Sequence, residues 1–455
     1  MTDTPNTSNS LFDYEPEKPP DIGAEINWDD DRLTQVLEHE IEGNVAFFRN
    51  AWRQFDTGIW GDREKEEIRR MVRVFLRKFR TKRVKVQAGQ VSSLEVMLRD
   101  AVFVADRVLN EIQKEQKMYI PLRNGIFNLE DWKLEPHRKD LYFTYRLDFD
   151  YDEDADCPTF RKYLDSSLVT PDGTPDSMLK QFLQEVMAYC MTARTDLKAS
   201  FWLLGKPDSG KSTFISFMRE LMGPLHVSID MEQMGKNQFM LSSLIGKRLA
   251  TCTEAEAGTM IADGLYKALS GGTDAIWTDV KNRDGISFIP EVKLLWAMNN
   301  APRTRDRSDA IFNRLKIIPF NRSVPKAERD PKLLEKLLAE KSGIFTQLMW
   351  EYRRLVRRGE FEVPEQSQMS LEAYRLQNDT ERTFLNECAI KKQDGKIQTN
   401  ELYTAYKAWC LESGHRPKGL NEVANDWQRL GMESKKSTSG LNYWFGYELR
   451  TRSLL

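Results

Sequence analysis

A single stretch near the middle of the chain sets the expected architecture: Phe201-Trp-Leu-Leu-Gly-Lys-Pro-Asp-Ser-Gly-Lys-Ser-Thr-Phe-Ile215. Phe201 to Leu204 predicts a short apolar strand, Gly205 to Gly210 a tight loop, and Lys211 to Met222 an amphipathic helix. Strand, G-x-x-x-x-G-K-[ST] loop and helix in this order are the context of a phosphate-binding loop. Its backbone N–H groups and the helix amino terminus attract anionic oxygens. The stretch therefore predicts nucleoside triphosphate binding.

The residues of this loop receive expected roles. Lys211 is expected to place its charge on the β- and γ-phosphates of ATP, and the Ser212 hydroxyl to ligate Mg²⁺. The other nucleotide-binding candidates are Gly205, Lys206, Pro207, Asp208, Ser209, Gly210 and Thr213. An ordinary strand–turn–helix corner is the alternative, and the flanking pattern disfavours it.

The composition limits the class of protein. A length of 455 residues favours about three domains. Contents of 40% hydrophobic and 30% charged residues are typical of a soluble globular protein. We expect no membrane span, because no long apolar run occurs, and a cytoplasmic location, because no signal sequence is visible. The formal net charge of -2 means that any nucleic-acid contact must depend on local patches.

The first 150 residues predict an acidic tail and then a mixed domain. Residues 1–31 hold nine carboxylates against one lysine and are expected to be disordered. Residues 32–150 predict an N-terminal α+β domain, with helices at Leu33–Ile41, Asp62–Phe79 and Leu94–Gln113 and short strands between and after them. Between Gly61 and Gln87, eleven Lys or Arg residues stand against four Asp or Glu. That excess fits either the solvated side of an amphipathic helix or a nucleic-acid contact.

Residues 151–195 predict a helical connector, and residues 196–325 an ATPase core. The connector helices, Thr159–Ser167 and Asp176–Arg194, are expected to pack against the core without a chemical role. In the core, Leu249 to Thr253 predicts a buried strand that ends at Glu254 and Glu256. Ligands of parallel α/β sheets bind at the carboxyl ends of the strands.

The two glutamates supply what hydrolysis requires. Ser212 and Glu254 are the expected Mg²⁺ ligands, although the spacing alone does not say which glutamate is the catalytic base. A helical first turn that is enriched in Glu is the alternative for Glu254 and Glu256.

Two further core residues are catalytic candidates. Asn299 ends the strong predicted strand Val292–Met298, where an amide can reach the γ-phosphate or the attacking water. A strand-end turn is the alternative use of an Asn there. Arg314 precedes another apolar strand, from which an arginine can act on the nucleotide of a neighbouring subunit.

These motifs follow one another at the spacing of a known family. They are Gly205–Thr213, the Glu254/Glu256 strand, Lys267-Ala-Leu-Ser-Gly-Gly-Thr-Asp274, Asn299 and Arg314-Leu-Lys-Ile-Ile-Pro-Phe320. The chain resembles superfamily 3 helicases of the phage/plasmid and poxvirus primase-helicase type. The resemblance implies an AAA+-like P-loop ATPase core in which Glu254 and Glu256 form the Walker B element. It also implies that Asn299 is sensor 1 and that Arg314 is the arginine finger.

The resemblance also implies a DNA-gripping hairpin between Gly271 and Pro290. Its tip would offer Lys281, Asn282 and Arg283 as phosphate contacts, and an ordinary charged turn is the alternative. Two features depart from the family. Gly-Gly-Thr-Asp replaces its Gly-Gly-Asp, and we expect a separate primase or polymerase partner, because the chain has no room for a primase domain.

The last part predicts a helical lid over residues 326–364 and a winged helix over 365–455. Pro331 to Arg357 has the period of a long helix or helical pair, and Glu365 to Gln368 is a plausible linker. The winged helix is expected from three short helices and a basic strand–turn–strand segment, Gly431–Tyr447. Lys435 and Lys436 would contact DNA phosphates, while a winged helix that binds only protein is the alternative.

The resulting hypothesis is a hexameric, Mg²⁺- and ATP-dependent DNA helicase for replication of a phage, plasmid or mobile element. It would act on single-stranded or forked DNA, and 3′-to-5′ movement is implied by the resemblance alone. One alternative is an ATP-switched origin-binding or replisome-loading factor that does not unwind DNA. A structural ATPase oligomer of the defence type is a third.

Overall fold

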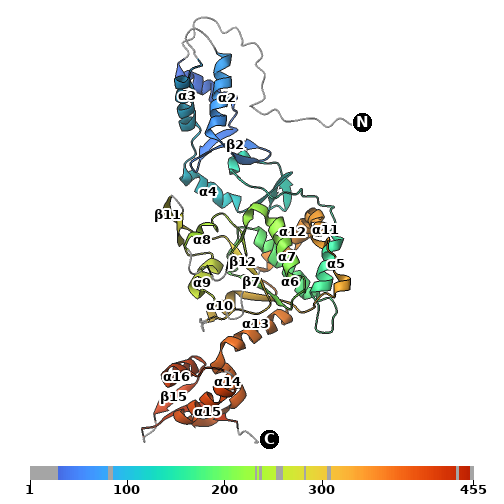
Figure 1. Ribbon diagram of the computed structural model, residues 1–455, viewed down its shortest axis with the longest axis vertical. Helices are drawn as coiled ribbons and strands as arrows, with labels where there is room; N and C mark the ends of the chain where they lie inside the picture. Colours follow the sequence, from blue (N-terminus) through green and yellow to red (C-terminus); the bar gives the residue numbers. More distant parts are fainter. Residues whose placement is uncertain are drawn as a thin grey trace.

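The computed structural model describes residues 29–79, 86–230, 233–234, 238–252, 260–280, 283–304, 309–413, 415–436 and 440–450. The molecule is elongated, with an N-terminal lobe at one end, an α/β core in the middle and a C-terminal domain at the other end (Figure 1). No helix within these ranges is both long and apolar enough to cross a membrane.

The N-terminal lobe combines helices with a small antiparallel sheet. The helices are α1 (Asp30–Glu40), α2 (Lys65–Lys78), α3 (Ala88–Ala101) and α4 (Asp106–Gln116), and the sheet has the order β1 (Val45–Phe48), β2 (Ala51–Asp56), β3 (Ile59–Arg63). Apolar side chains recur on one face of α2, including Ile68, Val72 and Phe75, and this face is buried against α1 and α3.

Two predicted boundaries in this lobe are wrong. The helix predicted from Asp62 begins at Lys65, because Ile59–Arg63 pairs with β2 as a strand. The single helix predicted over Leu94–Gln113 is divided into α3 and α4. Between them, the Val102 carbonyl accepts from Phe47 N–H at 3.1 Å, and Val104 N–H donates to the Phe47 carbonyl at 3.0 Å. These bonds use backbone groups that a continuous helix would need.

A second antiparallel sheet and two helices lead to the core. The sheet contains β4 (Tyr119–Leu122), β5 (Gly125–Asn128) and β6 (Lys133–Glu135), and a 3₁₀ turn, η1 (Lys139–Leu141), follows. The helices are α5 (Pro158–Ser167) and α6 (Ser177–Met191), close to their predicted ranges. As expected, most of α6 is buried.

The core is a five-stranded parallel sheet between two helical layers. Its order is β13 (Leu315–Phe320), β7 (Ser200–Gly205), β12 (Lys293–Met298), β9 (Leu249–Cys252), β8 (His226–Ser228). Because alternate side chains of a strand point to opposite faces, Phe201 and Leu203 join one hydrophobic cluster and Trp202 joins the other. The mixed α/β architecture with a parallel sheet, which the sequence predicts, is confirmed, and it is consistent with a nucleotide-binding core.

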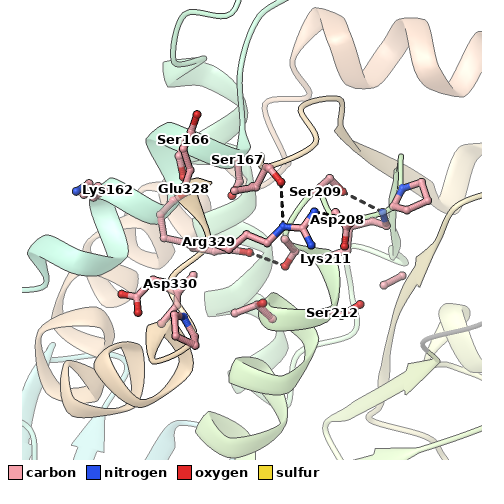
Figure 2. A pocket seen from close by; sticks show the side chains of 18 of the residues that line it. Lys162, Ser166, Ser167, Asp208, Ser209, Lys211, Ser212, Glu328, Arg329 and Asp330 are labelled. Atoms are coloured by element: carbon pink, nitrogen blue, oxygen red, sulfur yellow. Dashed lines mark hydrogen bonds and ion pairs between the residues drawn. The ribbon is translucent and has the colours of Figure 1, made fainter. Parts of the chain in front are cut away.

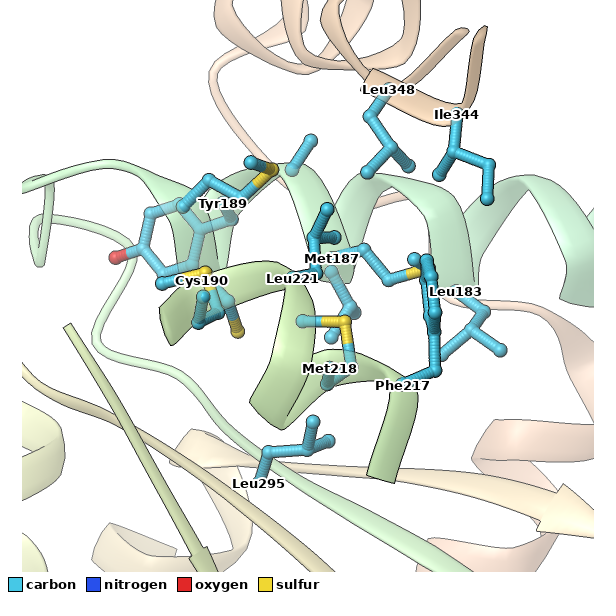
Figure 3. Close-up of a cluster of buried hydrophobic side chains, with 14 of the residues drawn as sticks. Leu183, Met187, Tyr189, Cys190, Phe217, Met218, Leu221, Leu295, Ile344 and Leu348 are labelled. Atoms are coloured by element: carbon cyan, nitrogen blue, oxygen red, sulfur yellow. The ribbon is translucent and has the colours of Figure 1, made fainter. Parts of the chain in front are cut away.

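Helices cover both faces of this sheet. On one face, α6 and α7 (Lys211–Met222) pack with α11 (Leu333–Ala339) and α12 (Lys341–Arg358), and Leu183, Met218 and Leu348 belong to the hydrophobic cluster between these helices (Figure 3). The other face is covered by α8 (Gln238–Ser242), α9 (Asp263–Gly271), α10 (Asp309–Arg314) and α13 (Glu365–Asn378). The remaining core elements are η2 (Gly223–Leu225), β10 (Ile276–Val280), β11 (Arg283–Phe288) and η3 (Lys326–Glu328).

The C-terminal domain contains three helices and a three-stranded antiparallel sheet. The helices are α14 (Thr380–Cys388), α15 (Thr399–Glu412) and α16 (Leu420–Arg429), and the sheet order is β14 (Ala389–Gln398), β16 (Asn442–Leu449), β15 (Glu433–Lys436). The three predicted helices and the predicted strand pair are present. Strand β14 was not predicted, because most of its side chains are polar and exposed.

Glu365 to Gln368 is not a linker. These residues form the first turn of α13, which packs along β13 and buries Tyr374 against Trp202 of the core sheet. The connection between core and C-terminal domain is therefore a helix that is itself part of the core packing.

Candidate nucleotide site

The predicted phosphate loop has the backbone conformation that its sequence requires. β7 ends at Gly205, one residue beyond the predicted strand Phe201–Leu204, and α7 begins at Lys211, as expected. Asp208 (φ 60) and Gly210 (φ 94) both occupy the left-handed region, so the chain reverses sharply between strand and helix. Gly210 is the N-cap of α7, and no side chain caps that helix. The amino terminus of α7 thus has free N–H groups for an anionic ligand.

Gly205 is required for the packing of β7 beside β13. A Cβ atom at this position would lie 2.0 Å from the carbonyl oxygen of Phe320 in the neighbouring strand β13. Only glycine therefore lets the end of β7 lie beside β13. Gly205 and Lys206 do not line the pocket next to the loop, whereas Pro207 to Thr213 do.

The Lys211 side chain extends into the loop, where its ammonium group is bound by loop atoms. Its Nζ donates to the carbonyl oxygens of Gly205 at 2.9 Å and Lys206 at 2.7 Å, and to Ser209 Oγ at 3.0 Å. The residue is only 6% exposed. Burial lowers the pKa of Lys211, and the nearby Asp208 carboxylate opposes that shift. The charge is thus held at the floor of the pocket, next to the exposed Ser212.

The pocket lies at the carboxyl edge of the parallel sheet and has a volume of about 1410 Å³. Small-molecule pockets commonly measure roughly 300–1,000 Å³, so a nucleoside triphosphate can be accommodated. Beside the loop, its wall includes Asn299 and Asn300 at the end of β12 and Asp230 after β8. Met298 and Leu204 are paired in register, which brings the predicted Asn299 to the side of the phosphate loop.

Helix α5, for which the sequence predicts no chemical role, forms a second wall. Tyr163 donates from its hydroxyl to the Gly210 carbonyl at 3.1 Å, and burial raises the pKa of this phenol. Lys162, Ser166 and Ser167 also line the pocket (Figure 2). A Cβ atom at Gly210 would come within 3.2 Å of Ser167 Oγ, so the loop and α5 fit closely together.

The segment after β13 closes the third side. Val324 N–H donates to the Asp208 carbonyl at 2.8 Å, and Ser323 Oγ donates to the Pro207 carbonyl at 3.0 Å. Arg329 Nη2 forms an ion pair with Asp208 Oδ2 at 2.9 Å and also lines the pocket (Figure 2). Sequence reasoning missed Arg329, because it lies 121 positions from Asp208 and belongs to no motif.

The residues present fit a magnesium nucleotide. Lys211 and the uncapped start of α7 suit the phosphates, and Lys162, Arg329 and Lys336 add positive charge around the same pocket. The Ser212 side chain is exposed, and both Ser212 and Asp230 line the pocket. Oxygen ligands of this kind are those that Mg²⁺ prefers.

Arg314 lies at the other edge of the sheet. It ends α10 immediately before β13, and Leu315 is paired with Ser200, the first residue of β7. Its Nη1 donates to the Ala310 carbonyl at 2.7 Å, and its Nε is buried without a hydrogen-bond partner among the described residues. Six residues of β7 separate the two edges, which corresponds to roughly 17 Å at 3.3 Å per residue. The residue does not line the pocket of its own chain.

Several predicted site residues lie outside the described residues. β9 ends at Cys252, and Glu254 and Glu256 follow it in the range 253–259, which the structure does not describe. Lys281 and Asn282 are also outside the described residues, as is the side chain of Arg283. These predictions stay predictions.

The hairpin expected between Gly271 and Pro290 is present as the antiparallel pair β10 and β11. Its most exposed large apolar side chain is Trp277, at 62%. A Cβ atom at Gly285 would lie 2.4 Å from the Trp277 indole, so the glycine allows the ring to lie against β11. The other side of the ring is left toward solvent. At the far end of the molecule, Lys435 and Lys436 are exposed on β15, and Lys435 Nζ lies 3.7 Å from Glu433.

Two family models match this sequence. One, described as D5 N terminal like, matches residues 32–169, which include the N-terminal lobe and α5. The other is a family of unknown function, DUF5906, that matches residues 203–314, from the phosphate loop to Arg314.

Viral proteins are among the similar sequences. "Putative helicase L207/L206" of Acanthamoeba polyphaga mimivirus is 24% identical over 322 residues, which cover 65% of this chain and 33% of that protein. "Putative helicase 121R" of Invertebrate iridescent virus 3 is 24% identical over 350 residues, 69% of this chain and 37% of that protein. The chain thus spans about a third of the length of these relatives.

Solved structures of the NrS-1 C-terminal region in the apo form share the fold. One chain has a TM-score of 0.53 and covers 92% of this chain and 100% of its own length, and another has a TM-score of 0.52 with 93% and 100%. Both are 12% identical, so the likeness concerns the fold alone. Together, these matches confirm the predicted resemblance and are consistent with the superfamily 3 helicase-like family.

Proposed function

We propose that this chain, whose matches are consistent with the superfamily 3 helicase-like family, is a subunit of a hexameric, ATP-dependent DNA helicase. The observation that carries the proposal is the phosphate loop, which opens into a large pocket with Lys211 buried at its floor. The viral relatives described as helicases support the DNA substrate, although this chain spans only part of their length.

Each pocket residue has a definite task in this proposal. The N–H groups at the start of α7 and the Lys211 ammonium bind the phosphates, and Ser212 and Glu254 hold Mg²⁺, which shields the phosphate charge when bound. Asn299 orients the attacking water, and Glu256 or Glu254 accepts its proton. Lys162 and Arg329 add phosphate contacts that the sequence did not predict.

The position of Arg314 supports a ring. Because it lies at the opposite edge of the sheet from the phosphate loop, its guanidinium cannot stabilise phosphoryl transfer in its own subunit. In a head-to-tail ring it would face the nucleotide of a neighbour and complete that site. The core therefore fits an AAA+-like ATPase in which every active site is shared by two chains.

The hairpin and the C-terminal domain are the proposed DNA contacts. Trp277 offers an aromatic surface for base stacking, and the neighbouring tip carries Lys281, Asn282 and Arg283 in the sequence. The order of helices and strands after α13 fits a winged helix, with Lys435 and Lys436 on its β-hairpin. Movement from 3′ to 5′ and a separate primase or polymerase partner complete the proposal.

The test is ATP-dependent unwinding of a forked duplex by the purified chain, with Mg²⁺ present and Lys211→Ala as the inactive control. We expect strand displacement by the wild type only, and six-fold particles on imaging of the same sample. Stimulation of ATP hydrolysis by single-stranded DNA should be lost in a Lys281→Ala/Arg283→Ala variant that keeps its basal rate.

A specific outcome favours the second candidate function. If the protein hydrolyses ATP and binds DNA but never separates the strands of a fork, it is an ATP-switched origin-binding or replisome-loading factor. The exposed hairpin would then hold DNA in one nucleotide state without moving along it.

A further inference from the structure

Helix α2 of the N-terminal lobe carries a stripe of arginines that the proposed function does not use. Arg70, Arg73 and Arg77 are exposed and recur at spacings of three and four residues, so they lie on one face of the helix. No carboxylate among the described residues forms an ion pair with any of the three. We call these residues the α2 arginine stripe.

The other basic residues of α2 are paired within the lobe. Lys65 Nζ lies 3.3 Å from Glu95 Oε2, Arg69 Nε lies 4.0 Å from the same oxygen, and Lys78 forms an ion pair with Glu40. The helix therefore separates its cations into two sets. One set fixes α2 to its neighbours, and the other faces solvent with no visible structural task.

The acidic residues nearest to the stripe along the helix are Glu66 and Glu67, four and three residues before Arg70. From Arg70 to Lys78 the sequence contains no Asp or Glu, and the acidic residues of α2 are confined to its first turn. The stripe spans roughly 10 Å at 1.5 Å per residue. Three guanidinium groups this close repel one another, and a polyanion along the helix would relieve that repulsion.

The chemistry of arginine and the position of the lobe both favour a nucleic-acid ligand. Guanidinium groups form bidentate bonds with phosphate oxygens, and a duplex presents a phosphate charge about every 1.7 Å along its axis. In Figure 1, α2 lies at the end of the molecule opposite the C-terminal domain and away from the nucleotide pocket. The stripe is therefore a separate surface from the hairpin and from β15.

We propose that the α2 arginine stripe binds the phosphate backbone of nucleic acid without regard to sequence. The proposal does not require unwinding or ATP hydrolysis, because electrostatic binding to phosphates needs neither. A chain that fails as a helicase can still bind DNA through α2.

The test compares two full-length variants that lose the same charge. One is Arg70→Gln/Arg73→Gln/Arg77→Gln, and the other, a control for net charge, is Lys133→Gln/Arg354→Gln/Arg357→Gln on other exposed surfaces. Binding to a labelled 30-base-pair duplex and to a 30-base single strand is measured without nucleotide over a series of salt concentrations. Circular dichroism confirms that both variants are folded.

We expect the stripe variant to bind at least one of the two DNAs about tenfold or more weakly than wild type at low salt. Three lost phosphate contacts should reduce the slope of log affinity against log salt by roughly two to three, since each contact contributes about 0.7 to 0.9. The control should stay near wild type. The duplex and single-strand arms show which form the stripe prefers, and Arg→Lys at all three positions should restore most of the salt slope.

Two outcomes would overturn the proposal. If both DNAs bind the stripe variant with the affinity and salt slope of the control, the stripe is only a solvated helix face. If DNA binding is unchanged but the particle mass differs from that of wild type, the arginines contact another subunit instead.

Discussion

Two buried lysines lie at opposite ends of the parallel strands of the central sheet, which we call its carboxyl edge and its amino edge. A comparison of the two distinguishes a binding site from a structural feature. Lys211, at the carboxyl edge, and Lys293, at the amino edge, are 6% and 2% exposed. Both donate to backbone carbonyls, and burial lowers the pKa of both. Lys211 lines the nucleotide pocket, however, whereas Lys293 does not and lies next to Tyr189 and the Thr192 carbonyl. Burial of a cation is therefore not evidence of a site unless a ligand can reach it.

In the proposed ring, Arg314 at the amino edge of one subunit completes the nucleotide site at the carboxyl edge of its neighbour. Removal of Arg314 therefore gives the largest expected loss of ATP hydrolysis. Arg314→Ala should leave nucleotide binding intact and reduce the ATPase turnover number by about a thousandfold, because an arginine finger contributes on this scale. The measurement is steady-state hydrolysis together with the affinity for a fluorescent nucleotide analogue. A turnover number near that of wild type would remove Arg314 from the catalytic site.

Mixing of variants tests whether Arg314 acts across an interface. Chains with Lys211→Met and chains with Arg314→Ala are each expected to be inactive. In a randomly mixed ring, about a quarter of the interfaces would combine two intact halves, so part of the activity should return. If the mixture stays as inactive as its components, the shared-site explanation is wrong.

Substitution of each buried lysine gives the next largest expected effect on ATP hydrolysis. Lys211→Met should reduce ATP turnover by about a hundredfold to a thousandfold, the scale for loss of a group that stabilises the transition state. Lys293→Met is the matched control, because it makes the same substitution at a buried lysine at the opposite end of the parallel strands. Hydrolysis by the control should stay within about twofold of wild type. Equal losses in both variants would mean that the lysines act through folding.

Arg329 tests the carboxyl edge beyond the predicted loop. Arg329→Ala removes a cation from the pocket wall and breaks the ion pair with Asp208. We expect the KM for ATP to rise about three- to tenfold with a smaller change in kcat, since a charged hydrogen bond contributes about 1.5–3 kcal/mol and this one is partly exposed. Arg329→Lys should recover part of the affinity. An unchanged KM would show that Arg329 only supports the loop.

The carboxyl edge was largely predictable from the sequence, because its signal is local. Strand, loop and helix around Lys211 occupy one continuous segment, and Asn299 directly follows a strand whose residues after Lys293 are all apolar. The walls supplied by Tyr163 and Arg329 could not be found in the same way. They reach the loop through tertiary packing of segments more than forty residues away, and neither residue belongs to a pattern with its own period.

Two differences between the predicted and the observed secondary structure also have physical causes. Strand β14 was missed because its residues alternate poorly and most are exposed, so the pairing with β16 rather than burial makes it a strand. The break between α3 and α4 was missed because the competing hydrogen bonds come from Phe47, which lies 55 residues before Val102 in the sequence. In both places tertiary contacts override the local pattern.

The smallest expected effect concerns stability at the amino edge. Lys293 faces Cys190, Arg248, Glu291 and Asp196, and burial lowers its pKa to about 7, well below its usual value. Between pH 7 and its unfolded-state value near 10.5, the unfolded chain holds a proton that the folded chain releases. The free energy of unfolding should therefore rise as the pH increases through this window.

Lys293→Met removes the titrating group, so its free energy of unfolding should change less with pH than that of wild type. Between about pH 7 and 9 we expect the change in the free energy of unfolding to differ between the two proteins by about 2 kcal/mol, measured by urea unfolding. Burial raises the pKa of the Cys190 thiol to about 12, so around pH 9 this thiol loses its proton only in the unfolded chain, and it does so in both proteins. Identical pH profiles for the two proteins would show that Lys293 stays charged, held by the carbonyl oxygens around it. The two edges of the sheet would then hold lysines in the same protonation state, and only the pocket would distinguish them.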